Sequence, residues 1–338
     1  EAIAAADGGT VKLLANAGEI TIGSPLKLDL NGKTAAKLTV TGEVTLASLL
    51  PEGCAFRSGS TWITDLIGTE LTNVSMAKIP IKSMNYPTEM SMTYGGAGTL
   101  IVNVRCTGAV TFQWYKVEDG KETAVGSAIT SNQFNLAAQK LSAGKHTFRF
   151  SATCNGYKKM SQDIVVTVQK ADIRSTPPTA RENLTYTGRE QALITAGSAS
   201  GGTMQYSLAE NGTYSQNIPT GTDAGAYTVW YRVIGDANHN DTEPASVAVR
   251  IGQKPLTITG VTAASKPYDG TTDADIPSVT FDNVTLNRDT DYTVTARFDD
   301  ASAGNVKNIT AIVTLMGQAA KNYALEQSSF NTTGNITK

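Results

Sequence analysis

The chain has 338 residues, of which 40% are hydrophobic and 17% are charged, and its formal net charge is −2. This length indicates two to four domains, and the apolar content is enough for several small cores. The near-neutral charge, without a dense basic cluster, excludes a protein whose main task is binding nucleic acid. No apolar stretch approaches the roughly 20 residues of a membrane-spanning helix, so we expect no membrane insertion.

Residues 1–71 are expected to form a segment of their own. Short strands separated by Gly and Asn turns are predicted at residues 10–14, 20–22 and 26–30. Such a series, without a long hydrophobic run, is typical of the coils of a parallel β-helix. An irregular antiparallel β domain is the alternative, because alternating apolar residues do not distinguish the two arrangements.

The rest of the chain repeats itself, and three markers recur in the same order. A Tyr-x-Gly motif begins at Tyr94, Tyr186 and Tyr268. An Ala-Gly pair follows at residues 143–144, 224–225 and 303–304. A lysine closes each unit at an interval of 84 residues, at Lys170, Lys254 and Lys338. Units of this length fit small β-sandwiches, which predicts domains at residues 72–170, 171–253 and 254–338.

The strand after each Ala-Gly pair alternates between apolar and polar residues, as one with a single buried face does. In the first unit the inward face is predicted to carry Phe148, Phe150, Ala152 and Cys154. In the second unit it is predicted to carry Tyr227, Val229, Tyr231 and Val233. Trp230 and Arg232 are then expected to point outward.

Cys106 and Cys154 both lie at inward positions near strand ends, with Trp114 between them in the sequence. This order is typical of an immunoglobulin sandwich with a disulfide between its sheets. Two reduced core cysteines are the alternative, because free cysteine is often buried. Cys54 lies outside the pattern and is the expected unpaired thiol.

The joints between units are short. Residues 169–172 and 253–256 contain no Gly/Ser tract, which argues against flexible linkers and favours a semi-rigid rod.

Three segments resemble known bacterial surface modules. Residues 266–272, Lys-Pro-Tyr-Asp-Gly-Thr-Thr, resemble the opening of the YDG-type repeat, and the second unit is similar to a related immunoglobulin-like repeat. Residues 72–170 resemble a bacterial immunoglobulin-like domain, and residues 1–57 resemble the end of a surface β-helix. These resemblances imply an extracellular, cell-surface setting and a structural or adhesive role. They supply no catalytic residue.

Clustered acids are the best candidates for a metal site. They are Asp269, Asp273, Asp275, Asp289 and Asp291. Calcium takes about six to eight oxygen ligands, which loops between β modules can supply. Ordinary turns, in which aspartate bonds its own backbone, are the alternative interpretation.

The outward Trp230 beside Arg232, or the loop from Asp236 to Asp241, is the candidate binding site for a glycan or a host surface protein. The alternative for Trp230 is that a neighbouring module covers its ring. The sequence lacks zinc, nucleophile-elbow and phosphate-loop motifs, so we predict no catalytic activity and no cofactor.

The hypothesis that follows is a monomeric, non-catalytic extracellular stalk or spacer. The alternatives are a glycan- or protein-binding module and an accessory region of a secreted enzyme.

Overall fold

The computed structural model describes residues 10–12, 16–22, 27–40, 49–50, 53–63 and 70–338. Within this part the chain is built almost entirely of β-strands, which confirms the all-β fold class. The chain divides into two compact units, Glu1–Ala171 and Asp172–Lys338.

The first unit begins with an N-terminal sheet. Its described strands are β1 (Thr10–Lys12), β2 (Ala17–Ile22), β3 (Lys27–Asp29), β4 (Thr34–Val40), β5 (Cys54–Ser58), β6 (Thr61–Trp62) and β7 (Glu70–Lys78). The pairs β1–β3 and β2–β4 are parallel, as in stacked coils, whereas β7 pairs antiparallel with β4 and β5. The described strands therefore include both the parallel pairs expected of a β-helix and the antiparallel pairs expected of an irregular β domain. A β-helix is not confirmed. Strand β7 crosses the predicted boundary at residue 71, so this sheet extends to Lys78.

The second part of the first unit is a β-sandwich, called the first module. Its strands are β8 (Ile81–Asn85), β9 (Glu89–Thr93), β10 (Thr99–Ile101), β11 (Asn103–Cys106), β12 (Val110–Glu118), β13 (Lys121–Ile129), β14 (Gln133–Asn135), β15 (Gly144–Cys154), β16 (Tyr157–Met160) and β17 (Ile164–Gln169). One sheet has the order β13-β12-β15-β17-β9, and the pairs β8–β11 and β10–β14 lie apart from it. Phe148, Phe150, Ala152 and Cys154 are fully buried, which confirms the inward face predicted from alternation.

The second unit begins with the second module. Its strands are β18 (Arg174–Thr176), β19 (Thr179–Ala180), β20 (Gln191–Ala192), β21 (Ile194–Thr195), β22 (Ser198–Ser200), β23 (Gly202–Ser207), β24 (Thr220–Gly221), β25 (Gly225–Gly235) and β26 (Ala245–Ile251). The main sheet has the order β23-β25-β26. Val229 and Val233 are buried in its core, and Tyr227 and Tyr231 are half-buried at positions of the same phase.

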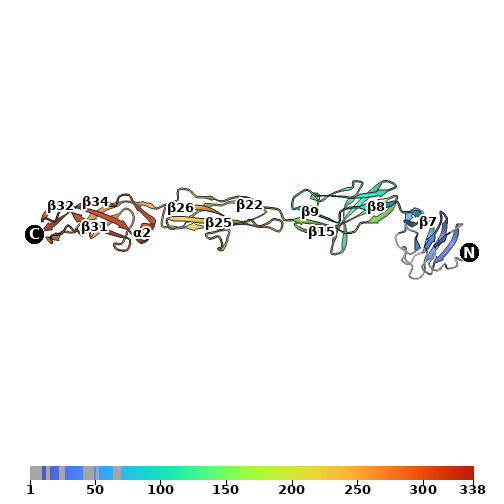
Figure 1. Cartoon of the computed structure of the whole chain (residues 1–338), viewed down its shortest axis with the longest axis horizontal. Coiled ribbons are helices and arrows are strands. Elements are labelled where there is room, and N and C mark those ends of the chain that lie inside the picture. The colour runs from blue at the N-terminus through green and yellow to red at the C-terminus, as the bar shows by residue number, and fades with distance from the viewer. Residues whose placement is uncertain (1–9, 13–15, 23–26, 41–48, 51–52, 64–69) are drawn as a thin grey trace. The chain divides into compact units, whose positions relative to one another are not determined.

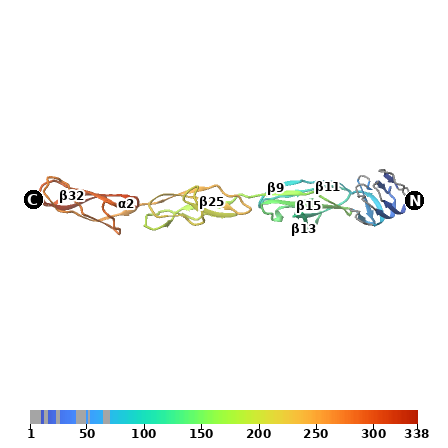
Figure 2. The ribbon, with the colours of Figure 1, turned by 90° about the horizontal axis from the view of Figure 1, so that it is seen from below.

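The third module completes the second unit. Its elements are β27 (Lys254–Leu256), β28 (Ile258–Thr262), β29 (Lys266–Pro267), β30 (Ser278–Phe281), β31 (Tyr292–Phe298), β32 (Gly304–Leu315), α2 (Gly317–Asn322), β33 (Tyr323–Leu325) and β34 (Ser329–Thr337). The main sheet has the order β29-β34-β32-β31. Within this module α2 lies at one end of the long strand β32, and the chain terminus lies at the other end (Figures 1 and 2). The module therefore has two different ends.

Candidate functional site

The repeated Tyr-x-Gly motif closes each module at the end of its last strand. The backbone N–H groups of Tyr94, Tyr186 and Tyr268 donate to carbonyl oxygens that follow or end this strand. The acceptors are Gln169 at 2.8 Å, Gly252 at 2.9 Å and Thr337 at 2.8 Å, respectively. The motif thus makes the same main-chain contact in all three modules.

The Ala-Gly pair lies at the same end. In the three modules Gly144, Gly225 and Gly304 pair with the last strand at Val168, Ile251 and Ile336. Lys170 and Lys338 follow that strand directly, whereas Lys254 lies three residues after Ile251 and begins β27 of the next module. The Tyr-x-Gly and Ala-Gly markers therefore converge on one end of each module, and the lysine spacing matches the structure only in the first and third modules. We call this end the exit end, since the chain leaves the module there.

The residues of the YDG motif have separate roles in the turn that they form. Gly270 has a φ of 74°, which glycine adopts without steric strain. The Asp269 carboxylate accepts hydrogen bonds from the Thr271 N–H at 2.9 Å and from the Lys266 ammonium at 2.8 Å. The ammonium beside it, with the Thr271 donors, holds the pKa of Asp269 at about 2. Tyr268 is left to point outward, with 60% of its surface exposed.

The exit end of the second module is joined to α2 of the third module by a buried amide. The Ala224 N–H donates to Asn322 Oδ1 at 2.7 Å, and Asn322 Nδ2 donates to Asp223 Oδ1 at 3.1 Å. Asn322 is only 3% exposed. A buried side-chain amide is tolerated when its hydrogen bonds are made, so this residue fixes where the two modules meet.

Charged and polar groups surround that amide. Lys321 Nζ lies 2.8 Å from Asp223 Oδ2, and Gln253 Nε2 donates to the Ala320 carbonyl at 2.7 Å. The Lys321 ammonium and the Asn322 amide lower the pKa of Asp223, and the Asp223 carboxylate raises the pKa of Lys321. Gln253 lies in the short segment between β26 and β27, and its bond to α2 ties this connecting segment to the third module.

An aromatic contact completes the joint. The rings of Tyr186 and Tyr323 lie 5.3 Å apart at 79°, an edge-to-face arrangement that aromatic pairs favour. Tyr186 belongs to the Tyr-x-Gly motif, so this marker also has a role between modules. Sequence reasoning found Tyr186 and the Ala224–Gly225 turn as markers but missed Asp223, Lys321 and Asn322, which belong to no recurring pattern.

The N-terminal sheet meets the first module through Trp62. Its indole Nε1 donates to the Asn155 carbonyl at 2.9 Å, and its ring lies 5.2 Å from that of Tyr157 in an edge-to-face contact. A pocket of about 580 Å³ is lined by Trp62, Lys158 and Met160.

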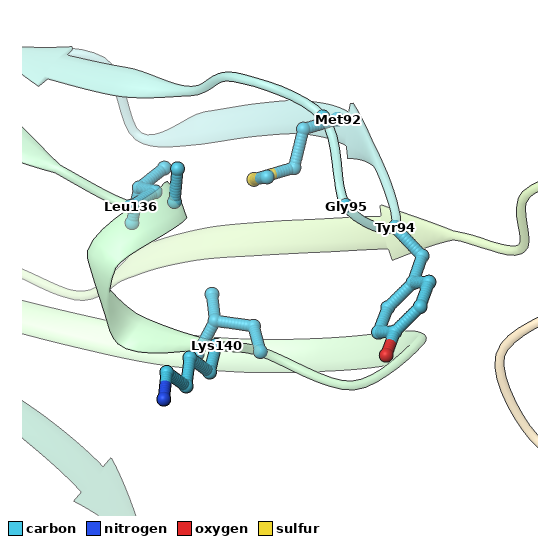
Figure 3. A pocket seen from close by; sticks show the side chains of 8 residues that line it. Met92, Tyr94, Gly95, Leu136 and Lys140 are labelled. Atoms are coloured by element: carbon cyan, nitrogen blue, oxygen red, sulfur yellow. The ribbon is translucent and has the colours of Figure 1, made fainter.

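The exit end of the first module contains a small pocket of about 260 Å³. Met92 and Leu136 lie on its inner side and the Tyr94 ring borders it, as Figure 3 shows. Lys140 supplies the charged group of the lining. The lining is mostly apolar and brings no nucleophile and base together.

Cys106 and Cys154 are joined as a disulfide between the two sheets of the first module, with Cα atoms 6.6 Å apart. Cys54 is the free cysteine. Trp114 is buried and stacks on Phe134, with ring centroids 4.4 Å apart. The register places Val110 opposite Cys154 and Trp114 opposite Phe150.

Trp230 lies on β25 opposite Ser207 and Ser246 and is half-buried. On the same face, the Arg232 guanidinium stacks over the Tyr214 ring at 4.3 Å. Tyr214 belongs to the segment that pairs back onto Tyr206 through Ser215. The module's own residues therefore cover part of the face that was predicted to bind a ligand.

Asp236 and Asp241 are used within their own loop. Asp236 Oδ1 accepts from the Asn238 N–H at 2.8 Å and lies 2.7 Å from His239 Nδ1. Asp241 Oδ1 accepts from the Gly235 N–H at 2.8 Å. His239 and the Asn238 N–H lower the pKa of Asp236. These bonds are those of a capped turn.

The acids proposed for calcium are also bonded within the third module. Asp275 pairs with Arg288 at 3.3 Å, and Asp291 accepts from the Asn287 N–H at 2.8 Å. Asp273 forms a backbone bridge to Arg297, and the Asp289 N–H donates to the Tyr292 carbonyl at 2.8 Å. Over the described part of the chain, no three acidic, histidine or cysteine side chains gather as metal ligands.

None of the helices in the described ranges has the length and apolar character needed to span a bilayer.

Comparison with known proteins identifies one of the modules. Residues 252–330 match the YDG domain, as the Tyr-Asp-Gly motif predicted. No curated protein matches the chain. Among solved structures, immunoglobulin domains 1–4 of Sidekick-1 are 13% identical, with 84% of this chain and 90% of that chain covered and a TM-score of 0.27.

The N-terminal four immunoglobulin domains of Dscam1 isoform 4.44 are 10% identical, with 96% of this chain and 98% of that chain covered and a TM-score of 0.23. TM-scores this low do not define a common arrangement. From its own strands the chain is an all-β protein, and its residues 252–330 match the YDG domain.

Proposed function

We propose that the chain is a non-catalytic extracellular spacer, a stalk segment of a bacterial surface protein. The joint between the second and third modules is the observation that carries this proposal. It uses a buried amide, an ion pair and an aromatic contact at a place where a flexible linker would need none of them. Specific contacts at a module boundary limit the relative motion that separate domains otherwise have.

The polar residues of the modules support the same proposal, because their bonds serve turns and joints. Asp269, Asp236 and Asp241 cap the backbone of their own loops, and Asp223 binds the next module. The alternative of a glycan-binding face on β25 has less support, since Trp230 is half-buried and Arg232 stacks on Tyr214.

Small-angle scattering on the purified chain, with calcium and with a chelator, tests the spacer. We expect a monomeric, elongated particle whose maximum dimension is the same in both conditions. A compact particle, or one that lengthens with calcium, would contradict the proposal and direct attention to the acids at Asp273 and Asp275.

The location is tested separately. An antibody against the third module should label intact cells that produce the protein, and a protease added outside should remove the label. Labelling only after the cells are broken would contradict a surface location without affecting the spacer geometry.

A further inference from the structure

The pocket beside Trp62 lies where the N-terminal sheet meets the first module, and the hairpins β5–β6 and β15–β16 supply its walls. Its lining residues are Ser60, Thr61, Trp62, Gly156, Lys158 and Met160. The volume of about 580 Å³ is within the range of roughly 300–1,000 Å³ that is typical of small-molecule sites. None of these residues belongs to the joint between the second and third modules, on which the spacer proposal rests.

The wall formed by Trp62 is fixed before any ligand arrives. Its indole Nε1 donates to the Asn155 carbonyl at 2.9 Å, and its ring makes an edge-to-face contact with Tyr157. The Arg57 guanidinium lies 5.0 Å from the centre of the Trp62 ring, and Arg57 Nη2 donates to the Ser60 carbonyl at 3.0 Å. A wall held in this way loses little conformational freedom on binding, which favours affinity.

The opposite wall combines a positive charge with an apolar side chain. Lys158 and Met160 are two residues apart on β16, so their side chains lie on the same side of the strand. Met160 is 37% exposed. Lys158 Nζ donates to the Tyr115 hydroxyl at 3.2 Å, and an ammonium group has three donors, so others remain for a ligand. Among the described residues that line the pocket none is acidic, so the pocket favours an anion.

The lining therefore offers three kinds of contact. The ammonium of Lys158 can pair with a carboxylate, and the hydroxyls of Ser60 and Thr61 can donate and accept hydrogen bonds. Trp62 and Met160 add apolar surface. A small inorganic anion would leave that apolar surface unused, and an apolar ligand would bury the ammonium and hydroxyl groups without partners, which costs free energy. A sugar ring with a carboxylate has all the complementary features: a negative charge, hydroxyl groups and an apolar C–H face.

We propose that this pocket binds a sugar that carries a carboxylate, such as a uronic acid residue. Lys158 would pair with the carboxylate, and Ser60 and Thr61 would bond to the ring hydroxyls. The C–H face of the sugar would pack against Trp62. The site is separate from the face around Trp230, and binding here would add adhesion to the spacer role without changing it.

Nuclear magnetic resonance on the full chain tests the site. Tryptophan labelled with ¹⁵N gives three indole signals, from Trp62, Trp114 and Trp230, and Trp62→Phe identifies the first by removing it. Titration with glucuronate at neutral pH should shift the Trp62 signal to saturation and leave the Trp230 signal in place. Methyl β-glucoside, which has the same ring and no charge, should bind at least about tenfold more weakly, because a charge-assisted bond is missing.

A third ligand separates two sources of the same chemistry. Methyl β-glucuronide has a glycosidic bond, as the end of a polysaccharide does. Tighter binding of this compound than of free glucuronate indicates a glycan as the source, and the reverse order indicates a free sugar acid. Either order supports the site.

Lys158→Gln and Lys159→Gln are matched variants. The two lysines are neighbours on β16, so their side chains point to opposite sides of the strand, and Lys158 is the one that lines the pocket. Lys158→Gln should weaken glucuronate binding about tenfold, to the level of the glucoside. Lys159→Gln, which changes the net charge equally, should stay within about twofold of the natural chain. An unshifted signal of the buried Trp114 shows that the first module is folded in each variant.

Two results with the folded chain would overturn the inference: no saturable shift of the Trp62 signal, or equal weakening by both lysine substitutions. Tighter binding of triglutamate than of glucuronate would overturn it as well, because the pocket would then be a site for an acidic peptide. None of these results affects the spacer proposal, which scattering tests independently.

Discussion

The side-chain oxygen of Asn322 accepts a 2.7 Å hydrogen bond from the backbone N–H of Ala224, a residue of the preceding module. The bond joins groups that are 98 residues apart in the sequence, and Asn322 is 3% exposed. A backbone donor and a side-chain amide are thus both removed from water by the same contact. Losing it would leave both unsatisfied, which is why the joint has a defined geometry.

Replacing Asn322 with alanine should uncouple the two modules. The Ala224 N–H would lose its acceptor and the Asp223 carboxylate would lose one of its two donors, at a cost of about 1–3 kcal/mol in the free energy of unfolding of the second unit. Urea unfolding followed by circular dichroism measures this loss. The exposed Asn287, changed to alanine in the same module, is the control and should change the midpoint little. Equal effects of both substitutions would contradict a special role for Asn322.

The ion pair in the joint should respond to acid. Because the pKa of Asp223 is lowered from 3.8, its contribution to stability is fully present above that value and is lost as the pH falls through the lower folded pKa. The pKa of Lys321 is raised from 10.5, so its contribution is present below pH 10.5 and is lost at higher pH. The amide resonance of Ala224 should therefore stay constant between these limits and shift below about pH 4.

Asp223→Asn is the variant that separates this effect from general acid unfolding. Its Ala224 resonance should already be shifted at neutral pH and should lack the acid step. The amide of Thr271 is an internal reference, because it is bonded to Asp269, whose pKa is about 2. An Ala224 step that survives in the variant would show that another group causes it.

The modules themselves were predictable because local rules determine them. Alternation placed Phe148, Phe150 and Val229 on the inward faces, and the structure buries all three. The Tyr-x-Gly and Ala-Gly markers recur because each module closes its last strand with the same main-chain contacts.

The joint was not predictable from the same rules. Asp223 and Asn322 are 99 residues apart, and each alone reads as an ordinary surface residue of a turn or helix end. Likewise, alternation marked Trp230 as outward but gave no sign of Tyr214, which covers Arg232 beside it from a separate loop. Contacts between distant polar residues carry no periodic signal.

The disulfide of the first module should be present in protein purified without reductant. Alkylation in denaturant should modify one cysteine, Cys54, and only after reduction also Cys106 and Cys154. Reduction should lower the stability of this module by about 2–4 kcal/mol, because the bridge closes a long loop in the unfolded chain. Cys54→Ser is the control and should leave the unfolding midpoint unchanged. Three alkylated cysteines before reduction would contradict the bridge.

Trp62 should couple the N-terminal sheet to the first module. Trp62→Ala removes the bond to the Asn155 carbonyl and the ring contact with Tyr157. We expect faster cleavage by a protease between Lys78 and Ile81, with the first module left intact, because the connection there becomes freer. Trp62→Phe keeps a ring and loses only the N–H, so its cleavage rate should lie between those of the natural chain and Trp62→Ala. Cleavage at the wild-type rate in both variants would indicate that Trp62 does not restrain this connection.

The rigidity of the joint in the second unit can be measured by pulsed electron spin resonance. Nitroxide labels at the exposed positions Ser198 and Asp282, in a Cys54→Ser background, report the distance between the second and third modules. One narrow distance distribution is expected for the otherwise natural chain, and a distinctly broader one for Asn322→Ala. A broad distribution in both chains would show that the second and third modules move independently. It would contradict the claim that the joint makes this spacer semi-rigid.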